Sequence, residues 1–287
     1  MTICRSCFAA LGLFALSVTL ASAQQRPLVT EDPETIGTGN VLLEAGFDVE
    51  RSVAFPVFGL EGNLLRLPSL GVSFGFSSIL ELQIDGGFYH RLNVTSRDAA
   101  PLSPLLDFEG DSTHDVQDLV VATKIRLVPE APGRPGFGIR LATKLPFAGN
   151  DSGLGLETMD FYATALAGKT TRSVRIVGNV GIGLLSDPLV GTEQDRALLY
   201  GVSVARALRE GLEFVTEVNG RLSDGERDSP TGPLPTGTES RSALRFGARL
   251  TRGTVRVDGG LIVGLTSRDP SIGFTAGLTY VFKGFTP

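Results

Sequence analysis

The chain has 287 residues, a formal net charge of −5 at pH 7, 36 glycines and no tryptophan. Its acidic balance disfavours a nucleic-acid partner, because such partners attract basic surfaces. No run of about 18 or more apolar residues follows residue 23, which excludes membrane-spanning helices.

Residues 1–23 are predicted to be a cleavable export signal. Arg5 supplies the positive start, residues 8–20 an apolar core, and Ala21-Ser22-Ala23 a cleavage site of small residues. Both cysteines precede the apolar core, so the exported chain has no thiol for a disulfide or a metal site. Loss of Arg5 makes that chain slightly more acidic.

Residues 24–39 form a polar N-terminal segment that is expected to lie on the periplasmic side. It carries Glu31, Asp32 and Glu34 ahead of the first predicted strand. Two hypotheses for the place of this segment stay open. The segment either folds into the periplasmic mouth of the protein and pairs with arginines inside, or it is a frayed leader.

Alternation of polar and apolar residues predicts twelve strands between residues 40 and 282, followed by a tail at 283–287. Their ranges are 40–52, 64–77, 79–93, 115–128, 136–147, 159–169, 172–184, 196–208, 211–223, 240–252, 254–266 and 271–282.

The period of two is clearest in the strands that separate charged from apolar faces. In 79–93, Leu80, Leu82 and Leu92 are expected on one face, and Glu81 and Arg91 on the other. A helix would mix these residues on every face. The pattern therefore favours an all-β protein.

Short links alternate with longer ones along the chain. The links near 209–210 and at 253 are very short, whereas 94–114 and 224–239 are long. This asymmetry predicts a closed antiparallel transmembrane β-barrel of about 12 strands, with short periplasmic turns and longer extracellular loops. Such a barrel belongs in the cell outer membrane. A soluble β-sandwich is the alternative, because its strands alternate too.

Charged residues are expected to point into the barrel, away from lipid. The predicted lumen-lining residues are Glu44, Asp48, Glu81, Asp85, Lys124, Arg126, Arg140, Lys144, Glu213, Glu217, Arg241, Arg245, Arg249 and Arg256, with Glu50 on the same face. Opposed acidic and basic ladders would orient small solutes in a polar pathway. A packed network of ion pairs that closes a narrow barrel is the other interpretation.

The last predicted strand ends in an aromatic, apolar comb. Its members are Phe274, Ala276, Leu278, Tyr280 and Phe282. The comb resembles the terminal signal that outer-membrane barrel-assembly machinery recognises. The tail runs past Phe282, so a role for Phe285 stays open.

Enzymatic chemistry has little support in the sequence. His90 and His114 are the histidines available, and with Ser112 and Asp115 they suggest a surface hydrolase site only weakly, because no nucleophile motif accompanies them. Acidic residues in the loop 107–118 offer oxygen ligands for a divalent cation, although a solvated loop explains them as well. No cofactor or metal site is predicted.

Several short motifs resemble outer-membrane proteins of the "MetA-pathway of phenol degradation" family. They are Thr30-Glu31-Asp32-Pro33, Gly37-x-Gly39-Asn40, residues 118–124, Lys144-Leu145-Pro146 and residues 155–161. The resemblance implies a Gram-negative outer-membrane channel or transporter for small, aromatic or hydrophobic solutes. The alternative is a closed structural or surface-interaction barrel without transport. Lipid, lipopolysaccharide and the assembly machinery are the expected partners of a monomer.

Overall fold

The computed structural model describes residues 26–223, 226–227 and 234–286. The predicted export signal lies outside these residues. Within them, no helical segment has the length and apolar character of a membrane span.

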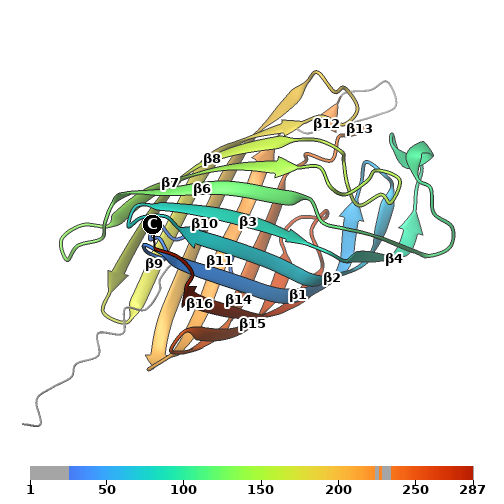
Figure 1. Cartoon of the computed structure of the whole chain (residues 1–287). Helices are drawn as coiled ribbons and strands as arrows, with labels where there is room; N and C mark the ends of the chain where they lie inside the picture. The colour runs from blue at the N-terminus through green and yellow to red at the C-terminus, as the bar shows by residue number, and fades with distance from the viewer. Residues whose placement is uncertain (1–25, 224–225, 228–233, 287) are drawn as a thin grey trace, which may run out of the picture.

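Across the described residues, the chain folds into one antiparallel sheet that closes on itself (Figure 1). β1 (Asn40–Phe55) pairs on one side with β2 (Leu60–Gly75) and on the other with β16 (Ile272–Lys283). The sheet contains fourteen strands. Two of them lie outside the closed wall: β4 (His90–Arg97) pairs with the first half of β2, and β5 (Ser112–Asp115) pairs with β4. Twelve strands therefore form the closed wall, and the predicted barrel is confirmed.

The remaining strands of the wall follow one another in chain order. They are β3 (Leu80–Gly87), β6 (Leu119–Val128), β7 (Gly136–Leu145), β8 (Asp160–Thr171), β9 (Val174–Ser186), β10 (Gln194–Arg209), β11 (Leu212–Ser223), β14 (Arg241–Arg252) and β15 (Val255–Gly264). A 3-10 turn, η1 (Ser103–Leu105), and the short pair β12 (Glu226–Arg227) and β13 (Leu234–Pro235) lie in the loops.

The predicted strand 79–93 is in fact two strands, and the prediction for its second half was wrong. β3 ends at Gly87 and β4 begins at His90, and the inward-facing parity changes across the break. Glu81 is buried in β3, but in β4 the buried residue is Leu92, which was expected to face lipid. Pairing between β1 and β2 shifts register at the same level of the barrel. An irregularity shared by adjacent strands thus changes which residues face inward toward the long-loop end of the barrel.

Loop asymmetry is present as predicted, although the first hairpin is tighter than expected. β1 and β2 extend into the predicted loop 53–63 and leave only residues 56–59 between them. At the opposite end, the links 172–173, 210–211 and 253–254 have two residues each. Both ends of the wall, Asn40 and Lys283, lie at this short-turn end, where they are register partners.

The outer face of the wall is apolar and exposed in the isolated chain. Alternate residues of each strand point outward, among them Val180 and Ile182 in β9, Val202 in β10 and Leu278 in β16. Water would penalise so continuous an apolar belt, whereas lipid would cover it. The inner face carries charges, and closure through β1 gives each of the twelve wall strands a partner on both sides.

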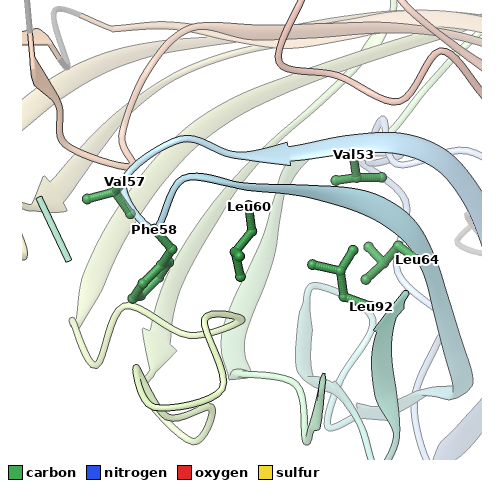
Figure 2. Packing of buried hydrophobic residues seen from close by; sticks show 6 residues of the cluster. All are labelled: Val53, Val57, Phe58, Leu60, Leu64 and Leu92. Carbon is green, nitrogen blue, oxygen red and sulfur yellow. The ribbon is translucent and has the colours of Figure 1, made fainter. Parts of the chain in front are cut away.

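A hydrophobic core lies at the long-loop end, around the tip of the β1–β2 hairpin (Figure 2). Its buried members are Val53, Val57, Phe58, Leu60, Leu64 and Leu92. Residues of the loops 98–108 and 146–156 pack against it, and the Leu102 amide donates to the Val57 carbonyl at 2.9 Å. We call this assembly the cap, because it gathers several long loops at that end.

Candidate functional site

Residues 26–36, which we call the strap, run through the inside of the barrel ahead of β1. Leu28, Thr30, Glu31 and Asp32 are buried there, and Ile36 is buried near the start of β1. The structure thus favours the reading in which the N-terminal segment enters the barrel, and the frayed-leader reading was wrong for these residues.

Wall side chains hold the strap by its backbone. The Glu217 carboxylate accepts the amides of Val29 and Thr30 at 2.9 and 2.8 Å, and Glu81 accepts the Ile36 amide at 2.8 Å. Asn179 exchanges two hydrogen bonds with the Glu31 backbone, at 2.7 and 2.8 Å. Irregular backbone inside a barrel needs such partners, since buried amides without them are costly.

Acidic side chains of the strap pair with basic side chains of β6, β7 and β9. Glu31 lies 3.5 Å from Lys124 Nζ and 2.9 Å from Arg140 Nε. Glu34 lies 2.5 Å from Arg126 Nη1, and Asp32 pairs with Arg175. These are charge-assisted contacts between side chains that are largely shielded from water. Removing either partner would therefore leave a buried charge without its counter-charge.

Arg175 also ties the strap to the turn 129–135. Its Nη1 lies 2.8 Å from Glu130 Oε2. Desolvation raises the pKa of the Glu130 carboxyl, but hydrogen bonds from the Thr170 amide, Arg175 and Lys169 outweigh it and lower that pKa. Glu130 is therefore an anion at neutral pH and completes the charge pairing of Arg175.

The first residue of the strap reaches the opposite wall. Arg26 donates to Thr275 Oγ1 at 2.8 Å and lies 3.8 Å from both Asp48 and Asp258. Its guanidinium fills the space left by the paired glycines Gly46 and Gly277, where a Cβ would overlap it. A wall without side chains at these two positions is thus shaped to admit the strap.

The structure places the predicted lumen-lining residues as follows. Those that contact the strap are Asp48, Glu81, Lys124, Arg126, Arg140, Glu217 and Arg249. Asp85, Glu213, Arg245 and Arg256 pair with other residues of the predicted set. Glu44, Lys144 and Arg241 contact Thr279, the carboxylates Asp118 and Asp160, and the carbonyls of Ala54 and Arg268, respectively. Glu50 joins them through Arg66 at 3.0 Å. Asp85 is the most accessible carboxylate among these ion pairs, with 48% of its side chain exposed.

Sequence reasoning missed several polar residues of the interior. Arg26, Arg66, Arg175 and Arg221 all have hydrogen bonds or ion pairs there. Arg221 lies four residues after Glu217 in the same strand and therefore on the same face, so its inward direction could have been predicted. The inward direction of Arg66 could not have been predicted, because the alternation of inward and outward residues in β2 changes at the irregularity described above.

The described residues enclose a cavity of about 250 Å³ beside the strap, lined by Thr30 and Asp32, and two further cavities that bear on the charge of the interior. One, of about 410 Å³, is lined by the carboxylates Glu44, Asp85 and Asp118 together with Arg26 and His90, and we call it the acidic chamber. The other, of about 350 Å³, is lined by four arginines, and we call it the basic chamber. Its arginines are Arg66, Arg221, Arg241 and Arg245. Opposite charges therefore line different parts of one interior.

His90 and Asp115 are register partners in β4 and β5, and His114 is the partner of Arg91. Ser112 accepts a hydrogen bond from Arg91 Nε at 2.9 Å, and Asp115 accepts from the Gly149 amide and Ser152 Oγ. The ring of His114 lies tilted against that of Tyr89, with centroids 5.8 Å apart. Within the described ranges, no group of three or more His, Cys, Asp or Glu residues is arranged to hold a metal ion.

Aromatic residues of the predicted assembly signal lie on the outer face of β16. Phe274, Leu278 and Tyr280 are exposed there. Tyr280 and Phe282 stack with centroids 5.5 Å apart, whereas Phe285 of the tail packs against Phe76 at 5.6 Å. The role of these residues in assembly stays a prediction.

Solved structures share this fold at low sequence identity. An outer membrane channel from Pseudomonas putida F1 is 14% identical, with a TM-score of 0.60, over 88% of this chain and 98% of that chain. The NanC porin is 7% identical, with a TM-score of 0.49, over 84% of this chain and 98% of its own. The sequence matches no protein-family model and no curated protein. The likeness to the Pseudomonas putida channel shows an outer-membrane barrel fold. Membership of the phenol-degradation family stays a prediction.

Proposed function

We propose that this chain is an outer-membrane channel for small solutes, with a charge-lined lumen that the strap narrows. The observation that carries the proposal is the coexistence of acidic and basic chambers inside a closed barrel. Separated charges of opposite sign set up a field across the lumen and orient polar solutes. The short-turn end is periplasmic in this proposal, and the cap faces outward.

Three further points belong to the proposal. The permeants include the small aromatic or hydrophobic compounds that the family resemblance implies. The barrel acts as a monomer among lipid and lipopolysaccharide, without enzymatic activity. The comb of Phe274, Leu278, Tyr280 and Phe282 serves its insertion by the assembly machinery.

A closed structural barrel is the second candidate function. The strap fills the periplasmic part of the lumen with ion pairs, and the cap gathers the loops at the other end. A packed interior of this kind stabilises a wall without conducting.

Single-channel recording of the refolded protein in a planar bilayer separates the two functions. We expect a small, steady conductance, and a larger one when residues 26–36 are deleted, because the deletion vacates the lumen. Arg245→Glu should shift ion selectivity towards cations, since Arg245 lines the basic chamber. A folded deletion variant that stays silent would favour the structural barrel.

A further inference from the structure

Two arginines stand directly opposite each other inside the barrel. Arg221 of β11 and Arg241 of β14 are register partners, and both side chains point inward. Like charges at directly opposed positions of neighbouring strands are destabilising. A pair of this kind therefore calls for compensation by something else in the chamber.

The hydrogen bonds of this pair supply orientation but no counter-charge. Arg221 donates to the carbonyls of Glu239 and Gly237 at 2.9 and 3.1 Å. Arg241 donates to the carbonyls of Arg268 and Ala54 at 2.7 and 2.8 Å. Among the described residues, no carboxylate oxygen lies within 4.0 Å of either guanidinium. Each group carries five N–H donors, so both keep donors for a further acceptor.

The other charges of the basic chamber are already paired. Arg66 lies 3.0 Å from Glu50, and Arg245 lies 3.4 Å from Glu217. Asp269 accepts the Ser242 amide at 2.8 Å. Asp269 and Glu239 act on Arg241 only at a longer range, so among the described residues of the chamber the opposed arginines are the ones without a direct ion pair.

Apolar side chains make up another part of the chamber. Val53, Leu199, Ala243 and Ile262 line it beside the arginines. Val53, Ala243 and Ile262 are buried, so surrounding residues pack this wall from behind. A cavity of about 350 Å³ is within the size range of small-molecule sites.

We propose that the basic chamber binds a small organic anion with an apolar body, such as an aromatic carboxylate. The forks of Arg221 and Arg241 hold the carboxylate, and the apolar wall contacts the body of the solute. The inference deepens the proposed function, because it names a solute class for the lumen. Its test is a binding measurement that needs no ion flow.

Fluorine NMR of the refolded full-length barrel in detergent measures this binding, with empty micelles as the blank. The probes are 4-fluorobenzoate, the neutral 4-fluorobenzyl alcohol and fluoroacetate. We expect 4-fluorobenzoate to bind at least about tenfold more tightly than the alcohol, because hydrogen bonds to charged groups are strong. Fluoroacetate should bind more weakly than 4-fluorobenzoate, since it leaves the apolar wall uncovered.

Variants locate the site. Arg221→Gln combined with Arg241→Gln should weaken 4-fluorobenzoate binding by about tenfold or more. The matched control is Arg206→Gln, an exposed arginine near the short-turn end of β10, which should bind as the unmodified chain does. Arg221→Lys with Arg241→Lys keeps both charges but loses the forks, and should be intermediate. Heat-modifiable migration in gels verifies that each variant is folded.

Equal affinity for the acid and the alcohol would overturn the proposal, as would full affinity in the folded glutamine variant. Equal affinity for fluoroacetate and 4-fluorobenzoate would overturn the role of the apolar wall. Binding without conductance would support the anion site and refute the channel, whereas conductance without binding would do the reverse.

Discussion

Lys124 and Glu81 are cross-strand partners whose side chains are fully buried, with Nζ 3.1 Å from Oε1. The other oxygen of Glu81 accepts the Ile36 amide at 2.8 Å. One ion pair therefore joins the wall of the barrel to the strap.

Lys124→Met should destabilise the folded barrel by about 3–5 kcal/mol, because it leaves the buried carboxylate of Glu81 without its cation. The free energy of unfolding in urea, measured on protein refolded in liposomes, tests this expectation. The paired change Lys124→Met with Glu81→Gln should recover much of the loss. If the single variant is as stable as the original chain, the pair is not the anchor that its geometry indicates.

Glu31→Gln should loosen the strap without changing its shape, because it removes the charge that faces Lys124 and Arg140. We expect the single-channel conductance to exceed that of the unmodified chain, because a loosened strap narrows the lumen less. Glu109→Gln, in the exposed acidic loop, is the matched control. Equal conductances in both variants would argue against narrowing of the lumen by the strap.

Val202→Arg should place a charge in the lipid belt. Val202 is 56% exposed in the middle of β10, where an arginine facing hydrocarbon costs about 2–4 kcal/mol. Leu265→Arg, just beyond the end of β15, is the control and should cost little. Unfolding from liposomes measures both. Similar small losses at the two positions would be inconsistent with a membrane-spanning belt.

Phe282→Ala should lower the yield of folded barrel in the outer-membrane fraction, since it removes the aromatic end of the β16 comb. Phe285→Ala provides the comparison, because Phe285 packs on Phe76 instead of lying in the comb. Heat-modifiable migration of the membrane fraction gives the folded share. A larger defect for Phe285→Ala would transfer the signal to the tail.

Strands with unbroken alternation could be predicted from the sequence, because lipid on one side and charge on the other enforce a period of two. β15 illustrates this, with Arg256 and Asp258 inward and Val257 and Leu261 outward. The break between β3 and β4 could not be predicted, because it depends on an irregularity in the neighbouring strand β2. Register shifts of this kind are set between strands, not within one.

The inward direction of most charged residues of the interior followed from parity alone, but their partners did not. The hydrogen bonds from Glu217 and Asn179 to the strap join segments far apart in sequence. The strap itself has no periodicity to read, since wall side chains fix its path. Its three acidic residues suggested pairing with arginines inside, but they left open whether the segment is inserted or frayed.

The strap takes no part in the sheet. None of the described strand pairings involves residues 26–36, which the wall holds through its side chains. It can consequently leave the interior without breaking a single inter-strand ladder bond. The sheet and the strap are therefore held by different sets of contacts. Substitutions can change the stability of the barrel wall and the ease with which the strap leaves the lumen independently of each other.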